Sequence, residues 1–168
     1  MTPRHLALLA LAFPVALEAQ ATAAVYRGFA PGAVYRDFAE RARALAVGDP
    51  LVCNTSKQTA QLMECGVVIR DPADSATFYL SAYVLEGRVA FVSFGDSGAA
   101  PLVDRVRADL AARFGAGKRT GYSTLEWTYG RQVIRFNWRG RGQTRWIYVT
   151  LWDGDVMDRI SRYVNRKQ

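Results

Sequence analysis

The sequence predicts a single α+β domain: an antiparallel sheet built from two tandem helix–β3 units, with the helices on one face and a short helix at the C-terminus. Three observations support this. Residues 77–85 and 88–94 have the alternating pattern of two strands around Glu86-Gly87, which is typical of a β-hairpin. The stretch Thr124–Asp153 holds all four tryptophans and predicts three further antiparallel strands with Gly-containing turns. Each group of strands follows a segment with helical periodicity, at about 33–46 and 101–114.

Each predicted helix has apolar residues on one side, which should face the sheet. These stripes are Val34, Phe38, Ala42 and Leu45 in the first helix, Leu102, Val103, Val106, Leu110 and Phe114 in the second, and Val156, Met157, Ile160, Tyr163 and Val164 in the last. Pro101 favours the start of the second helix. The two units therefore cover approximately residues 33–98 and 99–168.

The N-terminus predicts a secretory signal peptide over residues 1–23. Arg4 precedes an apolar run, and small residues suited to cleavage follow it. Pro14 and Glu18 interrupt this run before it reaches the length of a membrane span, although an uncleaved anchor is the alternative. No cysteine lies near the cleavage region, so a lipid anchor is not expected. We expect residues 24–168 to be a single domain in the periplasm or outside the cell.

Cys53 and Cys65 are the two cysteines of the chain. An even number in an exported protein favours a disulfide bond, which would stabilise the fold by about 3 kcal/mol. A redox motif would need C-x-x-C spacing, and a zinc site would need more thiols or histidines. The pair is therefore predicted to be a structural disulfide.

Catalytic chemistry is poorly represented in the sequence. The single histidine, His5, lies in the predicted signal peptide, which argues against Ser-His-Asp and Cys-His machinery and against common zinc sites. Carboxylates remain available for a hydrolase: Glu126, Asp153, Asp155 and Asp158. We expect a protein that is not an enzyme, with no catalytic residues, no cofactor and no metal, and a carboxylate hydrolase is the remaining alternative.

The turns within Thr124–Asp153 predict the strand register. A two-residue turn at Gly130-Arg131 pairs Glu126 with Arg135. A four-residue loop at 140–143 then places Arg135 opposite Tyr148, Asn137 opposite Trp146 and Arg131 opposite Trp152. The predicted core face comprises Leu125, Trp127, Tyr129, Ile134, Phe136, Trp138, Ile147, Val149 and Leu151. The opposite face supplies the candidate binding residues Arg131, Arg135, Asn137, Trp146, Tyr148 and Trp152.

The charge distribution favours an anionic partner. The net charge is +7, and residues 99–168 contain 14 basic against 6 acidic residues. Arginine and aromatic side chains are enriched at protein-interface hot spots, so a protein partner is expected. An anionic envelope polymer or lipid surface is the alternative, and export argues against nucleic acid as the ligand. A solvated face without a partner is also left open, because a compositional bias alone could produce many arginines.

A set of residues in the second unit resembles a known module. These residues are Val106, Leu110 and Phe114-Gly115, then Trp127 and Tyr129, then Ile147, Val149 and Leu151, then Asp153-Gly154 and Val156. They resemble the helix-plus-three-strand module of the SmpA/OmlA (BamE) outer-membrane assembly lipoproteins. The architecture is also similar to that of secreted β-lactamase inhibitor proteins. The lipoprotein cysteine is absent, and two units stand where those lipoproteins have one. The resemblance implies a protein-binding role in the cell envelope without catalysis.

Overall fold

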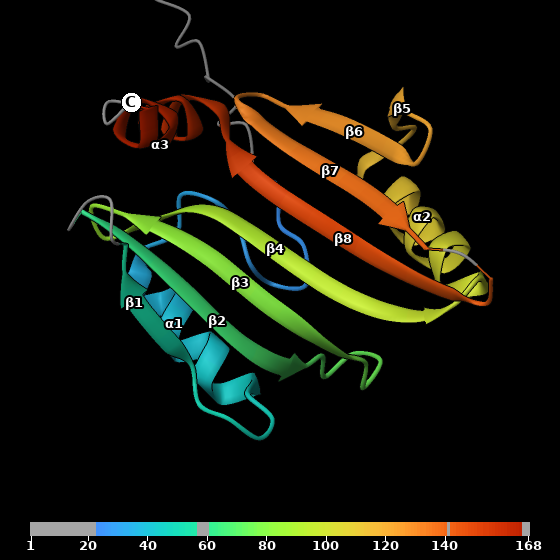
Figure 1. Cartoon of the computed structure of the whole chain (residues 1–168), viewed down its shortest axis with the longest axis horizontal. Helices are drawn as coiled ribbons and strands as arrows, with labels where there is room; N and C mark the ends of the chain where they lie inside the picture. The colour runs from blue at the N-terminus through green and yellow to red at the C-terminus, as the bar shows by residue number, and fades with distance from the viewer. Residues whose placement is uncertain (1–22, 57–60, 141, 166–168) are drawn as a thin grey trace, which may run out of the picture.

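The computed structural model describes residues 23–56, 61–140 and 142–165, which form three helices and eight strands (Figure 1). The predicted signal peptide lies outside these residues except for Ala23. In chain order the elements are α1 (Tyr35–Leu45), β1 (Val52–Thr55), β2 (Leu62–Arg70), β3 (Thr77–Leu85), β4 (Arg88–Ala99), α2 (Pro101–Phe114), β5 (Lys118–Gly121), β6 (Thr124–Tyr129), β7 (Gln132–Arg139), β8 (Thr144–Asp153) and α3 (Gly154–Asn165).

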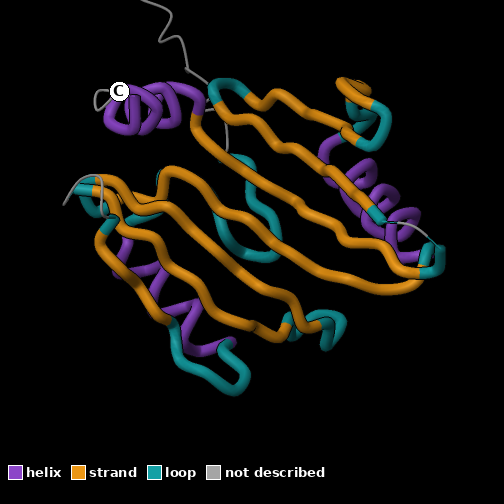
Figure 2. Tube along the Cα trace, viewed as in Figure 1, coloured by secondary structure: helices purple, strands orange, loops and turns teal. Residues whose placement is uncertain are grey.

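All eight strands belong to one sheet (Figure 2). Their order is β1-β2-β3-β4-β8-β7-β6-β5, and every neighbouring pair is antiparallel. The predicted α+β class with an antiparallel sheet is confirmed. Each half of the chain contributes a helix followed by four strands, where the sequence predicted three. The additional strands, β1 and β5, are only four residues long and lie at the two edges.

The middle of the sheet is formed where β4 pairs with β8. This pairing continues to Ala99 opposite Thr144, so β4 extends through a segment that includes Gly95 and Gly98. The sequence predicted that this strand ends at residue 94, just before Gly95, and glycine has low strand propensity. That prediction was wrong because hydrogen bonding to the long strand β8 outweighs the local preference.

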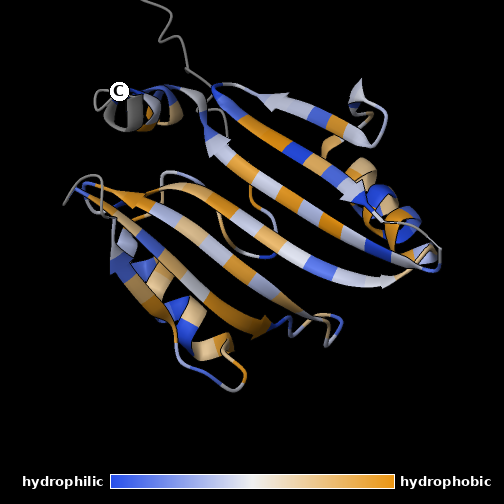
Figure 3. Ribbon diagram, viewed as in Figure 1, coloured by the Kyte–Doolittle hydropathy of each residue, from blue (hydrophilic) through white to orange (hydrophobic). Residues whose placement is uncertain are grey.

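One face of the sheet packs against α1 and α2. Polar and apolar residues alternate along the strands, as Figure 3 shows, so successive side chains point to opposite faces. The strand residues of the main core cluster lie on one of these faces: Cys65, Val67, Ile69, Phe78, Leu80, Ala82, Val84, Val89, Val92, Phe94, Leu125, Trp127, Ile134, Phe136, Ile147, Val149 and Leu151. The same cluster contains Phe38, Ala39 and Ala42 of α1 and Leu102, Val103, Val106 and Leu110 of α2.

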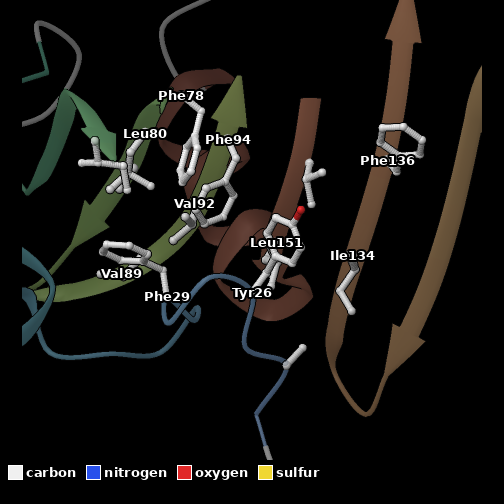
Figure 4. Close-up of a cluster of buried hydrophobic side chains, with 14 of the residues drawn as sticks. Tyr26, Phe29, Phe78, Leu80, Val89, Val92, Phe94, Ile134, Phe136 and Leu151 are labelled. Carbon is white, nitrogen blue, oxygen red and sulfur yellow. The ribbon is translucent and has the colours of Figure 1, made fainter. Parts of the chain in front are cut away.

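The chain before α1 completes this core. Tyr26 and Phe29 are 1% and 3% exposed, and both rings contact Phe94, with centroids 5.1 Å and 6.0 Å away (Figure 4). Arg27 lies between them in sequence and forms an ion pair with Asp71 at 2.6 Å. This segment, which precedes the first predicted helix, is therefore a packed part of the domain.

The third helix lies on the opposite face of the sheet. Ile160 of α3 forms a second buried cluster with Leu62, Leu85 and Ala90. Leu85 follows Val84, a residue of the main core, and therefore points away from α1 and α2. An ion pair between Arg159 and Glu86, at 2.6 Å, joins α3 to the β3–β4 turn.

The predicted disulfide is confirmed: Cys53 and Cys65 are directly opposite one another on β1 and β2 and are covalently joined. The bond thereby fastens the short edge strand to its neighbour. Among the described residues, no helix combines the length and the apolar character needed to cross a membrane.

Candidate binding face on the sheet

Within the described residues, no helix covers the centre of the sheet face opposite α1 and α2, and we call this face the open face. Its central residues come from β2, β3, β4, β8 and β7: Gly66, Val68, Tyr79, Ser81, Tyr83, Phe91, Ser93, Gly95, Ser97, Trp146, Tyr148, Thr150, Trp152, Val133, Arg135, Asn137 and Arg139. Helix α3 covers the end near Leu85. Val68, Tyr79 and Trp146 are 42%, 52% and 49% exposed, so the centre is accessible to solvent.

The sequence correctly predicted the face of the sheet for five candidate binding residues: Arg135, Asn137, Trp146, Tyr148 and Trp152. Their cross-strand partners on β7 and β8, however, were predicted wrongly. Arg135 lies opposite Thr150 and Asn137 opposite Tyr148. The predicted loop was two residues too short, because Arg139 pairs with Trp146 and not with Thr144.

Two features of the structure accompany the longer β7–β8 connection, one within the loop and one from the neighbouring strand β4. Gly140 and Gly142 both have positive φ, at 130° and 64°, a conformation that glycine adopts without steric cost. In addition, the start of β8 pairs with β4, through Thr144 opposite Ala99, and β8 pairs with β7 only from Trp146 onward. A shift of two residues preserves which face each side chain occupies, since the strand period is two.

Arg135 is held by two neighbours on the open face. Its Nε donates a hydrogen bond of 2.5 Å to a carboxylate oxygen of Glu126, the cross-strand partner predicted from the sequence. Its guanidinium carbon lies 4.8 Å from the centroid of the Trp152 ring, within cation–π range. The positive charge of Arg135 is therefore largely balanced by Glu126, and its position is fixed.

Arg139 is a component of the open face that the sequence analysis did not select. One guanidinium nitrogen donates a hydrogen bond of 3.0 Å to the hydroxyl of Tyr148, and the guanidinium carbon lies 5.4 Å from the centroid of that ring. Trp146 is directly opposite Arg139 on β8. Alternation along β7 places Arg139 on the same face as Arg135 and Asn137, and this is the sequence signal that could have identified it.

Arg131 is not part of the open centre. Its guanidinium contacts the carboxylates of Asp155 at 2.9 Å and Asp153 at 3.5 Å, at the start of α3. Asp153 also accepts a hydrogen bond from the backbone N–H of Asp155, at 3.1 Å, which is a helix-capping contact. The predicted position of Arg131 opposite Trp152 is wrong because Val133 occupies it. Arg131 braces the β8–α3 junction.

Tyr79 is the main component contributed by the first half of the chain. Its hydroxyl lies over Gly66 on β2, where a Cβ atom would overlap it. On one side of Tyr79 is a hollow of about 290 Å³ that includes Gly66, Ser81 and Phe91. On its other side is a hollow of about 510 Å³, which we call the Trp146 hollow.

The Trp146 hollow is formed by both halves of the chain. Its lining includes Val68, Tyr79 and Gly95 from the first half and Trp146 and Tyr148 from the second. Gly95 lies between the two tyrosines in the sheet, opposite Tyr79 on β3 and Tyr148 on β8. Because Gly95 has no side chain, it leaves space in the Trp146 hollow between the two tyrosine rings. Only the β4–β8 pairing, which no local pattern specifies, brings these residues together.

No protein-family model, curated protein or solved structure matches this chain. Within the described residues there is also no cluster of three or more histidine, cysteine, aspartate or glutamate side chains that could hold a metal ion.

A further hollow, of about 530 Å³, lies on the helix side of the sheet beside Tyr26, Arg27 and α2. Its charged groups are largely engaged with one another: Arg27 with Asp71 and Asp74, and Arg113 with Asp109. Burial alone would lower the pKa of Arg27, but its contacts with Tyr26 and the two aspartates raise it. These interactions fasten the N-terminal segment to the domain.

Proposed function

We propose that this chain is an exported binding protein that uses its open face to hold a protein partner. The observation that carries the proposal is the group of exposed apolar side chains at the centre of the sheet, Val68, Tyr79 and Trp146, accompanied by arginines. Contiguous exposed apolar surface is typical of interaction sites. Tyrosine, tryptophan and arginine are also the residues that dominate interface energetics.

The open face is suited to binding because its large side chains are already positioned. Tyr79 lies over Gly66, Tyr148 accepts a hydrogen bond from Arg139, and Trp152 lies beneath Arg135. Side chains that are ordered before association lose less conformational entropy when a partner arrives. The partner can therefore gain the full benefit of burying these rings.

A role without catalysis is part of the proposal. Three of the four carboxylates that could have supported hydrolysis contact arginines: Glu126 binds Arg135, and both Asp153 and Asp155 bind Arg131. A general acid must reach the reacting group with a carboxyl oxygen, and in these residues that oxygen contacts an arginine. Their arrangement supports a structural use for all three.

Export and a tandem origin complete the proposal. The disulfide is typical of proteins that function in an oxidising compartment, outside the cell or in the periplasm. Each half of the chain begins with a helix and continues into antiparallel strands, and the halves meet at β4 and β8. We therefore propose two tandem helix–strand units, with a BamE-like or inhibitor-like ancestry for the second.

The alternative is a binder of an anionic polymer or lipid surface, favoured by the positive charge of residues 99–168. The two functions differ in their response to salt. Polyanion binding through many cations weakens steeply as salt rises. An interface dominated by buried aromatic rings depends far less on salt, because its main contribution is apolar burial.

The test is capture of a protein partner from the medium or envelope fraction of the producing cells, using immobilised purified chain. A variant with both Tyr79→Ala and Trp146→Ala should lose the captured protein. Tyr122→Ala is the matched control, because Tyr122 is 95% exposed and lies in the β5–β6 turn, away from the open face. Equal capture by both variants, or release by moderate salt alone, would contradict the proposal.

A further inference from the structure

The Trp146 hollow has an apolar interior and a polar margin. Its lining includes the aromatic residues Tyr79, Tyr148 and Trp146 and the polar residues Thr77, Ser97 and Asp96. Sites of this kind accept an apolar side chain and orient it through a few polar groups at the edge. The volume of about 510 Å³ is open to solvent on one side and is ample for one or two amino-acid side chains.

Two charged residues lie at this hollow: Asp96, which also borders the hollow on the helix side of the sheet, and Arg139. Arg139 lies opposite Trp146, and its recorded contact is with the uncharged hydroxyl of Tyr148. Within the described residues it has no ion pair with a carboxylate, in contrast to Arg135, which is bound to Glu126. An arginine carries five N–H donors in a planar array that matches a carboxylate, so most of its donors remain for a ligand.

We infer that the Trp146 hollow and Arg139 together recognise an acidic segment of a protein: a carboxylate of the partner binds Arg139 while an adjacent apolar side chain enters the hollow. This inference rests on the proposed function and adds the chemistry of the partner. The surplus of basic residues in the second half of the chain would also attract an acidic partner during association.

The local charge pattern favours a protein segment over a polymeric anion. A polyanion gains affinity from a row of cations that each replace a counterion. The centre of the open face has Arg135 and Arg139, and Glu126 already balances the first. One unneutralised arginine beside an aromatic hollow suits a single carboxylate flanked by an apolar residue.

The test uses three capped tetrapeptides with the purified chain: Ac-Gly-Asp-Leu-Gly-NH2, the same peptide with Asn for Asp, and the same peptide with Lys for Asp. Binding is followed by NMR through the indole N–H signals of the tryptophans. The Asp peptide should shift the Trp146 signal and bind about 2-fold to 5-fold more tightly than the Asn peptide, as expected for an exposed ion pair. The Trp127 signal should not move, since its N–H is bonded to the Gly115 carbonyl inside the core.

Arg139→Gln should remove the preference for the Asp peptide while leaving the weaker binding of the Asn peptide unchanged. Arg36→Gln is the matched control, because Arg36 is an exposed arginine on α1 and should leave the preference intact. A Trp146→Ala variant should lose binding of both peptides, which separates the apolar contribution from the charged one.

Three results would overturn the inference. Equal binding of the three peptides would show that the hollow has no acidic preference, and partner capture by the open face would still stand. No shift at Trp146 with any peptide would reject the hollow as the recognition site, leaving partner capture to decide the proposed function separately. Shifts at Trp146 with dextran sulfate or anionic phosphatidylglycerol vesicles, but not with the Asp peptide, would assign the face to a polyanion or a lipid surface.

Discussion

Trp127 on the core face and Trp146 on the open face come from the same three-stranded segment, but they should contribute very different amounts to the stability of the fold. Trp127 is 5% exposed, and its indole N–H donates a 2.8 Å hydrogen bond to the Gly115 carbonyl. Replacing Trp127 with alanine leaves a large cavity and an unpaired carbonyl, so the free energy of unfolding should fall by about 3–5 kcal/mol. Trp146 is 49% exposed and has roughly half of its ring area to lose. Trp146→Ala should therefore lower the free energy of unfolding by only about 1–1.5 kcal/mol.

Urea unfolding of the two variants, followed by circular dichroism, measures this contrast directly. In thermal unfolding of a domain of this size, the same losses correspond to a fall in Tm of about 9–15 °C for Trp127→Ala and about 3–5 °C for Trp146→Ala. The comparison is internally matched, since the same residue type is removed from two strands of one sheet. Equal losses of stability would refute the assignment of Trp146 to an open face. A larger loss of stability for Trp146→Ala than for Trp127→Ala would show that Trp146, and not Trp127, lies on the core face.

Three further predictions concern the frame around the open face. Reducing the disulfide between β1 and β2, which closes a sequence separation of 12, should lower the free energy of unfolding by about 3 kcal/mol in urea titrations. Gly66→Ala should displace the ring of Tyr79, because the new Cβ would overlap its hydroxyl, and should weaken peptide binding in the NMR titration while the far-UV spectrum stays unchanged. Asp74→Asn should reduce stability near neutral pH and have no effect in strong acid, as measured by Tm against pH.

The sign of the Asp74 prediction follows from its pKa. Slight burial raises this pKa, but the hydrogen bond from the Ala76 N–H and the charge of Arg27 lower it more, so the net shift is downward from 3.8. The stability that Asp74 contributes is present above pH 3.8 and is lost as pH falls through the lower folded-state value. A difference between wild type and Asp74→Asn that persisted in strong acid would contradict this.

Matched controls also apply to the other two predictions. Gly117→Ala, under the buried ring of Trp127, should cost stability without affecting peptide binding, in contrast to Gly66→Ala. Reduction should not alter the unfolding of a variant with both cysteines replaced by serine. An unchanged midpoint for the wild type after reduction would show that the edge strand needs no covalent link.

The sequence was sufficient to predict which face each residue of β6, β7 and β8 occupies. Alternation alone determines this, and the two-residue turn at Gly130 correctly placed Glu126 opposite Arg135. The partners of β8 were wrong because the β7–β8 connection depends on β4, a strand distant in sequence. Tyr129 was also predicted as core but is 40% exposed, since it is the last paired residue of β6 beside the turn.

The composition of the candidate site was less predictable than the fold class. Tyr79 and Gly95 join Trp146 only through the β4–β8 pairing, and such long-range pairing has no local sequence signal. The periodicity of α3 predicted an apolar stripe, but the stripe could have packed on either face of the sheet. Its packing against Leu85 and Ala90 determines how much of the open face remains uncovered.

Site-specific photo-crosslinking in the producing cells tests the central claim most directly. A photoreactive amino acid at Ser97, an exposed residue beside the Trp146 hollow, should give a discrete covalent adduct with one protein after irradiation. The same amino acid at Tyr122, which lies away from the open face, should give none. An adduct formed at Tyr122 but not at Ser97 would show that the open face of the sheet is not where the partner binds.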